Sequence, residues 1–318
     1  MSFRVLGTGS CLPSRVVSNQ ELSAFLDTSD EWIAQRVGVR ERRVCTTETT
    51  TELACSAAKV ALESSGVVPG ELDMIICATV SAENAAPSLA CSVQSMIGAV
   101  CPAMDINAAC SGFIYALDTA AGFFIRGAKR ILVIGAERLS GLLDWNDRST
   151  TVIFGDGAGA MVLGEGCEYL ASKLYARGNS AVLSIPNRAG ASPYYENKPS
   201  EPFVRMNGQE TFKFAVNAMC TDLTDVVSAA GLTMDDITWI VPHQANARII
   251  DASARKLGIE PERCLKNIDK VGNTSAASIP ILADELFRSD KLNEGDHIAM
   301  CSFGAGLTSA ACVIKYKA

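Results

Sequence analysis

Cys110 is the one cysteine in this sequence whose neighbours could make it a nucleophile. Residues 104–106 predict a short strand, small residues follow, and the pattern from Phe113 predicts a helix, so Cys110 lies at a strand-to-helix junction. The free N–H groups and partial positive charge at a helix N-terminus favour the thiolate, the reactive form of cysteine. These residues alone fit a nucleophile and a small buried helix-start cysteine equally well.

Two further polar residues occupy similar junctions. Residues 237–242 predict a buried strand, and His243 follows its end, where catalytic groups of α/β folds gather. The chain has 2 histidines, and the other, His297, precedes a strand and is expected to be an exposed turn residue. Asn273 precedes a helix that we expect to run through Leu286, and by itself it fits a helix-capping residue. His243 is therefore the candidate catalytic histidine.

Two glycine-rich segments, 155–159 and 302–306, could also serve a reaction. Neither is followed by the Lys-Ser/Thr pair of a P-loop, and neither forms GxGxxG after a first strand. We therefore expect tight turns whose backbone N–H groups lie near a reacting carbonyl oxygen.

The composition excludes several classes of protein. The 318 residues are 48% hydrophobic and 20% charged, which predicts a sizeable packed core. A net charge of −7 argues against a nucleic-acid-binding protein. Without a secretory signal or an apolar run of about 20 residues, the chain is expected to be cytoplasmic and not bound to a membrane. The 12 cysteines form no CxxC pair and only 2 histidines exist, so we expect reduced core cysteines and no metal site.

The elements that position these residues alternate between strands and helices. Residues 74–78 and 131–134 predict buried strands, and residues 51–65 predict a helix between turn signals, which indicates an α/β fold. A helix, a glycine stop, an acidic turn and a buried strand occur around Gly66 and again around Gly231, about half the chain later. We therefore expect a duplicated fold with halves at 1–168 and 169–318.

Taken together, segments 107–113, 241–246 and 272–280 resemble the motifs of the β-ketoacyl-acyl-carrier-protein synthase III family. These condensing enzymes initiate fatty-acid synthesis. The resemblance extends over nearly the whole chain, from 7–10 to 304–306. It implies the thiolase-like fold, in which two βαβαβαββ halves form five αβαβα layers, and it implies a homodimer.

The resemblance also implies a role for each polar residue. Cys110 would take an acyl group from acyl-coenzyme A, which is a substrate, so no cofactor is expected. Malonyl-acyl-carrier protein would then lose CO2, with His243 and Asn273 donating hydrogen bonds to the enolate oxygen. The backbone N–H groups of Cys110 and Ala305 would form an oxyanion hole.

Residues that bind the substrates are implied by the same resemblance. Those matched to coenzyme A binding are Trp32, Arg36, Arg148, Gly208, Phe212, Asn246 and Ile249. Those matched to carrier-protein binding are Lys213, Gln244, Arg248, Arg255 and Lys256. Without the resemblance, Trp32 would fit an anchor of an amphipathic helix, and the basic residues would fit a solvated helix face.

Differences from related families favour a decarboxylating condensation over thiolysis and suggest a larger acyl primer. Elongating ketoacyl synthases have a second histidine in place of Asn273, and thiolases have a second cysteine where Ser302 stands, with Cys301 expected to face the other side of the strand. Ala86, expected to line the acyl pocket of the partner subunit together with Phe303, stands where acetyl-specific relatives often have Phe. We expect primers longer or bulkier than acetyl. A secondary-metabolism condensing enzyme and a non-catalytic acyl-binding protein remain alternatives.

Overall fold

The computed structural model describes residues 2–187, 194 and 201–317. Its first large sheet contains five strands. The first two pairings along the sheet are antiparallel, and the last two are parallel. In spatial order these strands are β1 (Ser2–Cys11), β7 (Asp156–Gly166), β6 (Arg130–Arg138), β4 (Met74–Ala78) and β5 (Ala103–Ile106).

The second large sheet repeats this order and these directions. Its strands are β8 (Tyr169–Ala176), β13 (Thr308–Lys315), β12 (His297–Gly304) and β11 (Trp239–Pro242). Where the first half has β5, the second has only a parallel bridge between Ile240 and Cys264. The expected duplication is therefore present, but the fifth strand of the second half is reduced to this single bridge. The chain passes from one sheet to the other between Gly166 and Tyr169.

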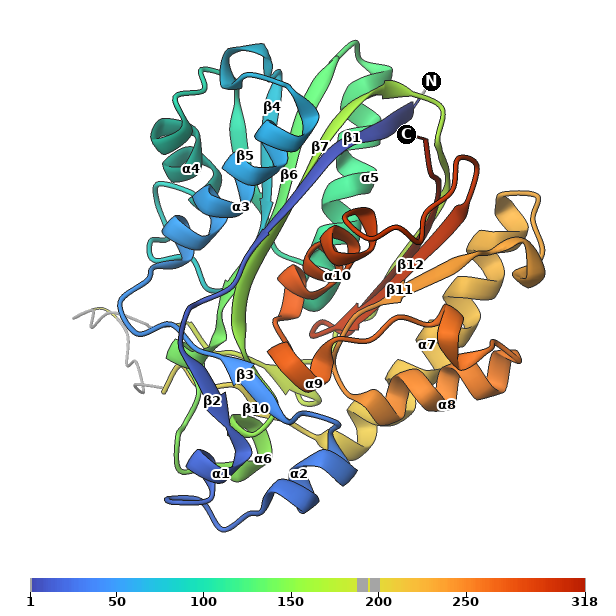
Figure 1. Cartoon of the computed structure of the whole chain (residues 1–318). Helices are drawn as coiled ribbons and strands as arrows, with labels where there is room; N and C mark the ends of the chain where they lie inside the picture. Colours follow the sequence, from blue (N-terminus) through green and yellow to red (C-terminus); the bar gives the residue numbers. More distant parts are fainter. Residues whose placement is uncertain (1, 188–193, 195–200, 318) are drawn as a thin grey trace.

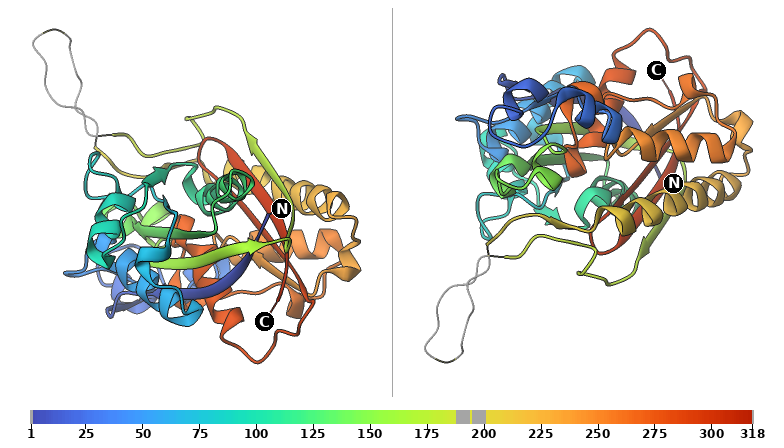
Figure 2. Two further views of the ribbon diagram at one scale, coloured as in Figure 1. Left: turned by 90° about the horizontal axis from the view of Figure 1, so that it is seen from above. Right: turned by 90° about the horizontal axis from the view of Figure 1, so that it is seen from below.

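Helices lie outside and between the two sheets and complete the five expected layers (Figures 1 and 2). Buried side chains from both sheets and from the two middle helices form one central core cluster. The first outer pair is α3 (Thr50–Ser65) and α4 (Leu89–Ile97), the middle pair is α5 (Gly112–Ile125) and α10 (Ser278–Phe287), and the second outer pair is α7 (Gly208–Ala229) and α8 (Ala247–Leu257).

Helix α3 illustrates how the sequence defines these layers. Thr49 and Glu52 form a capping box at its start, an arrangement in which the cap contributes about 1 kcal/mol, and Gly66 ends it with a φ of 69°. A Cβ on Gly9 of β1 would lie 2.4 Å from the carbonyl oxygen of Ala57. The helix therefore approaches the sheet closely because the strand has glycine there.

The glycine-rich segment 155–159 follows the same principle, and the prediction that it is a tight turn is wrong. Asp156–Gly159 form the start of β7, and this stretch is buried. A Cβ on Gly159 would lie 2.6 Å from the backbone nitrogen of Ile281 in α10. These glycines thus serve helix–sheet packing, because no side chain fits between β7 and α10.

A smaller layer at one end of the sheets is built from segments that interrupt the repeat. Its elements are β2 (Val16–Ser18), α1 (Asn19–Leu22), α2 (Asp30–Arg36), β3 (Glu41–Arg43), α6 (Arg148–Thr151), β9 (Leu183–Ser184), β10 (Arg205–Met206) and α9 (Ile268–Val271). Arg42, only 1% exposed, joins them by donating hydrogen bonds to Asn19 Oδ1 at 2.8 Å and to the carbonyl of Val152 at 2.8 Å. Figure 1 shows α2 and α6 together in this layer.

The helices and cysteines bear on two predictions from the sequence, that the chain has no membrane-spanning segment and that its cysteines lie in the core. Within the described residues, no helix is long and apolar enough to cross a membrane. The expectation that the cysteines lie in the core is wrong for Cys91 and Cys167, which are exposed.

Candidate active site

Cys110 lies in a 3-10 turn, Ala109–Ser111, directly before α5, as the junction in the sequence predicts. Ala109 has a φ of 49°, a conformation that residues with a Cβ rarely adopt. The end of β12 closes on this turn, because a Cβ on Gly304 would lie 2.7 Å from the nitrogen of Cys110. The strained turn and the missing side chain together bring the Cys110 backbone beside the 304–306 segment.

The thiol of Cys110 does not have the low pKa that its helix-start position predicts. Its pKa is raised to about 12, chiefly by desolvation and also by the charge of Glu137, whereas the Ser275 side chain acts to lower it. Desolvation exceeds the effect of the helix N-terminus because protein surrounds the thiol on the walls of the cavities that Cys110 lines. The resting residue is therefore a thiol that must pass its proton to another group.

His243 follows β11, and its imidazole is only 1% exposed. Burial lowers its pKa to about 3, so the ring is neutral. Nδ1 lies 2.6 Å from Ser278 Oγ, and the same Oγ accepts a hydrogen bond from the N–H of Gln244 at 3.3 Å. Among the described residues the Ser278 hydroxyl has no other acceptor, so its proton belongs to Nδ1. The tautomer that this favours has its proton on Nε2.

Asn273 is held by both its backbone and its side chain. Its N–H donates to the carbonyl of Ile153 at 2.9 Å, and its own carbonyl accepts from Gly155 at 3.0 Å. Its Oδ1 accepts a hydrogen bond from the Ser275 N–H at 2.8 Å. This contact fixes the orientation of the amide, so that the NH2 group is available as a donor.

Two cavities meet at Cys110. The first, about 210 Å³, is lined by Cys110, His243 and Asn273 together with Phe303. The second, about 470 Å³, lies on the other side of Cys110 and has apolar side chains such as Val80, Leu139, Leu183, Ile185 and Val204 in its wall, along with Ser275 and Ala305. The structure therefore brings the three predicted catalytic residues to one cavity, and it places Ala305 on the wall of its neighbour.

The residues predicted to bind coenzyme A lie along the approach to the first cavity. Gly208, Phe212, Asn246 and Ile249 line the cavity itself. Trp32 lies farther out on α2, and the guanidinium of Arg148 stands 5.2 Å from the centre of its ring. Arg36, at the end of α2, connects these two groups, because its carbonyl accepts a hydrogen bond from the side chain of Asn246 at 3.0 Å.

Of the residues predicted to bind a carrier protein, four are exposed. Lys213 follows Phe212 on α7, and Arg248 on α8 stands 5.8 Å from the Phe212 ring centre. Arg255 and Lys256 lie two turns farther along α8. Lys213 forms an exposed ion pair with Glu210 at 3.4 Å, whereas no carboxylate in the described parts of the chain pairs with the other three cations.

The prediction for Gln244 is wrong. Its side chain is 0% exposed, donates to the carbonyl of Pro242 at 2.8 Å and accepts from the N–H groups of Asn267 and Ile268 at 3.1 and 3.2 Å. A residue with these contacts cannot touch a carrier protein, because it holds β11 to the loop before α9. Ala86 is exposed and lines neither cavity of its own chain. His297 is not a turn residue but the partly buried first residue of β12.

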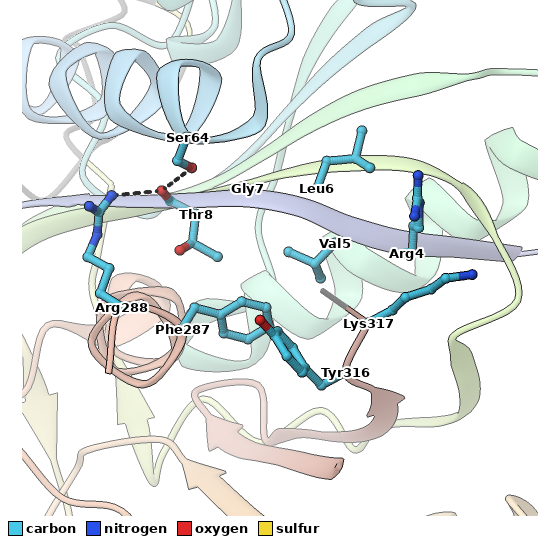
Figure 3. A pocket seen from close by; sticks show the side chains of 10 residues that line it. All are labelled: Arg4, Val5, Leu6, Gly7, Thr8, Ser64, Phe287, Arg288, Tyr316 and Lys317. Carbon is cyan, nitrogen blue, oxygen red and sulfur yellow. Dashed lines mark hydrogen bonds between the residues drawn. The ribbon is translucent and has the colours of Figure 1, made fainter. Parts of the chain in front are cut away.

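Another cavity, about 370 Å³, lies away from these residues, between β1, the end of α10 and the C-terminal strand (Figure 3). Two of the three cations that line it form ion pairs, because Arg288 binds Asp284 at 2.8 Å and Lys317 binds Glu168 at 3.4 Å. No group of three or more metal-binding side chains occurs among residues 2–187, 194 and 201–317. The cavities at Cys110 therefore remain the candidate active site.

Sequence reasoning missed Ser275, Ser278 and Gly304 as parts of this site. The two serines stand in the same motif as Asn273, at spacings of two and five residues, but nothing in the sequence says which polar atom each one meets. The sequence predicts Gly304 only as part of a turn, whereas it is the last residue of β12, and its contact with Cys110 depends on the folding of distant segments.

Comparison with known proteins identifies the family. The models of 3-oxoacyl-[acyl-carrier-protein] synthase III and of its C-terminal part match residues 104–178 and 227–316. A β-ketoacyl-[acyl-carrier-protein] synthase III from Aquifex aeolicus is 45% identical over 99% of this chain and 100% of its own, and its crystal structure superposes with a TM-score of 0.93. The priming β-ketosynthase of the R1128 polyketide pathway is 34% identical, with a TM-score of 0.92 over 99% of this chain and 96% of its own. The chain therefore belongs to the β-ketoacyl-[acyl-carrier-protein] synthase III family.

Proposed function

We propose that this protein condenses an acyl-coenzyme A primer with malonyl-acyl-carrier protein, giving 3-ketoacyl-acyl-carrier protein, CO2 and coenzyme A, as the first condensation of fatty-acid biosynthesis. Membership of the family supports this reaction. The observation that carries it is the convergence of Cys110, His243 and Asn273 on one cavity. In that cavity a nucleophile faces two neutral hydrogen-bond donors.

In the loading half-reaction, the sulfur of Cys110 attacks the thioester carbonyl of the primer. The carbonyl oxygen becomes an oxyanion, which the backbone N–H groups of Cys110 and Ala305 stabilise. Close approach of Gly304 to Cys110 brings these two backbone segments together. Coenzyme A then leaves, and the acyl group remains on Cys110 as a thioester.

In the condensing half-reaction, malonyl-acyl-carrier protein occupies the first cavity and loses CO2. The negative charge moves to the thioester oxygen, where Nε2–H of His243 and the NH2 group of Asn273 donate hydrogen bonds. A neutral imidazole is suited to this role because it donates without first having to gain a proton, and burial keeps it neutral. The enolate carbon then attacks the acyl thioester on Cys110.

The nucleotide end of coenzyme A and the carrier protein bind to the surface around the first cavity. Trp32 and Arg148 stack against each other, and a planar adenine would extend this arrangement. Lys213, Arg248, Arg255 and Lys256 form a basic face on α7 and α8 of an otherwise acidic protein, which suits an acidic carrier protein.

The second cavity supports a primer longer or bulkier than acetyl. Its volume of about 470 Å³ and its apolar wall can hold an alkyl chain attached to Cys110. The resemblance to the family implies a homodimer in which Ala86 faces the partner's acyl pocket. The exposure of Ala86 and its absence from both cavities of its own chain fit that arrangement. Ala86→Phe should abolish loading of long or branched primers and spare acetyl, whereas equal loss of both would contradict this assignment.

A panel of radiolabelled acyl-coenzyme A primers, followed by malonyl-acyl-carrier protein, tests the proposed function. Cys110→Ser should abolish label transfer to the protein, and Asn273→Ala should keep labelling but lose CO2 release. Protein that carries no Cys110-dependent label with any primer would refute the enzyme and leave a non-catalytic acyl-binding protein. Condensation with free malonyl-coenzyme A in preference to the carrier would instead point to a secondary-metabolism enzyme.

A further inference from the structure

In the proposed loading step, the Cys110 thiol must pass its proton to another group. In the favoured tautomer, Nδ1 of His243 accepts from Ser278 and Nε2 already carries a proton, so the ring has no free basic nitrogen. The amide of Asn273 is not basic. An inference about this proton rests on the proposed function, since it concerns the same half-reaction.

Glu137, the second-last residue of β6, is a buried carboxylate near this site, and it has no role in the loading and condensing steps given above. Its side chain is 0% exposed. Oε2 is held by the Ser81 hydroxyl at 2.5 Å, the Val80 N–H at 3.2 Å and the Thr79 hydroxyl at 3.4 Å. Oε1 is buried and has no hydrogen-bond partner among the described residues. One oxygen is thus anchored, and the other is available to a proton.

Ser275 stands between this carboxylate and the nucleophile. It begins the 3-10 turn Ser275–Ala277, has a φ of 50°, and lines the second cavity with Cys110. This turn packs against β6 so closely that a Cβ on Gly135 would lie 2.4 Å from the carbonyl of Ala276. Residues 135 and 137 lie on the same face of β6, so Glu137 points towards this turn as well. The Ser275 side chain also lowers the pKa of both the Cys110 thiol and the Glu137 carboxylate.

We propose that Glu137 accepts the Cys110 proton during loading and returns it after condensation, with the Ser275 hydroxyl as the relay. In loading, the S–H bond breaks, a C–S bond forms, and the proton passes through Ser275 to the Glu137 carboxylate. Coenzyme A leaves as a thiolate and takes a proton from water. In condensation, the C–S bond breaks and protonated Glu137 returns its proton to the Cys110 thiolate, so that the charge of the malonyl carboxylate ends on Glu137.

The surroundings of Glu137 suit transfer in both directions. It faces Thr79, Val80 and Ser81, which follow β4, and Ser275 and Ala276 in the 3-10 turn, and its charge acts on Cys110. The nearby charged residues Arg138 and Asp156 act instead on Cys45. Burial raises the pKa of Glu137 to about 7, and a group that titrates near neutral pH can both accept and donate a proton there.

Glu137→Gln tests this proposal because the two possible roles of the carboxylate predict opposite changes in the loading rate. If Glu137 acts only through its charge, which raises the pKa of the Cys110 thiol, its removal should accelerate loading. If it accepts the proton, single-turnover labelling of Cys110 should slow about 100-fold at neutral pH, a usual contribution of general-base catalysis. Acceleration or an unchanged rate would overturn the proposal.

The pH profile and two serine variants test the same relay without removing the carboxylate. The wild-type loading rate should rise with pH around 7, the pKa of Glu137. The Ser81 hydrogen bond lowers this pKa, so Ser81→Ala should shift the midpoint upward. Ser275→Gly, which tolerates the positive φ, should slow loading as much as Glu137→Gln, and the double variant should be no slower. An unshifted midpoint or additive losses would overturn the proposal.

Asp284→Asn is the control, because Asp284 is also a buried carboxylate bound by hydroxyls, those of Thr8 and Ser10 at 2.7 and 2.6 Å. It pairs with Arg288 at 2.8 Å and lines neither cavity at Cys110. Its loading rate and pH midpoint should equal those of the wild type. Failure of the proposed function is recognised separately, since the wild-type protein would then carry no label on Cys110. Wild-type labelling with an unaffected Glu137→Gln variant refutes the relay alone.

Discussion

Ser278→Ala should separate the two half-reactions. The Ser278 hydroxyl lies 2.6 Å from Nδ1 of His243, and both side chains are only 1% exposed, so water cannot replace the hydroxyl without rearrangement. Without it, Nδ1 has no donor, and the tautomer with the proton on Nε2 loses its preference. Decarboxylation needs that proton, whereas formation of acyl-Cys110 does not.

The expected loss follows from the value of one buried hydrogen bond. Leaving a buried polar atom unsatisfied costs about 1–3 kcal/mol, and each 1.4 kcal/mol is about a tenfold change in rate. Release of CO2 from malonyl-acyl-carrier protein should therefore fall about 5- to 150-fold, while single-turnover loading of Cys110 stays within about twofold.

The assay measures labelled CO2 and labelled acyl-enzyme from the same preparation. Ser253→Ala is the control, because Ser253 is an equally buried serine on α8 whose hydroxyl lies 3.8 Å from the sulfur of Met219 on α7. The reasoning is refuted if Ser278→Ala leaves CO2 release unchanged, or if both half-reactions fall by the same factor.

Three further predictions concern binding, packing and pH. Trp32→Ala and Arg148→Ala should raise KM for acyl-coenzyme A several-fold without changing kcat, and an acyl-pantetheine primer that lacks the nucleotide should show no difference. Gly159→Ala should lower the free energy of unfolding in urea by about 1–3 kcal/mol because its Cβ meets backbone atoms of α10, whereas Gly122→Ala, in an open helical position, should not lower it. Because folding lowers the pKa of His243 from 6.5 to about 3, the unfolded chain binds a proton that the folded chain excludes, so stability should fall as pH drops from 6.5 towards 3. His243→Gln should lose less stability over that range, and an equal loss would contradict the assignment.

The sequence by itself determined much of this protein because much of its information is local. Strand and helix periods and glycine stops predicted β4, α3 and the repeat around Gly66 and Gly231. The motifs around Cys110, His243 and Asn273 each include the strand end or helix start that positions the side chain. Their local patterns left Cys110 and Asn273 open to structural roles, and the resemblance of the three motifs to one family selected them before their cavity was known.

The remaining features depended on contacts between residues far apart in the chain, which no local pattern specifies. The segment 155–159 looks like a turn until α10 packs on it, and Gln244 looks like a surface residue until the loop before α9 covers it. Only the tertiary structure decided the state of the nucleophile. A helix start predicted a thiolate, but segments that are distant in the chain desolvate Cys110 and raise its pKa. The free energy of a charge depends on everything that surrounds it in space, and no local pattern specifies those surroundings.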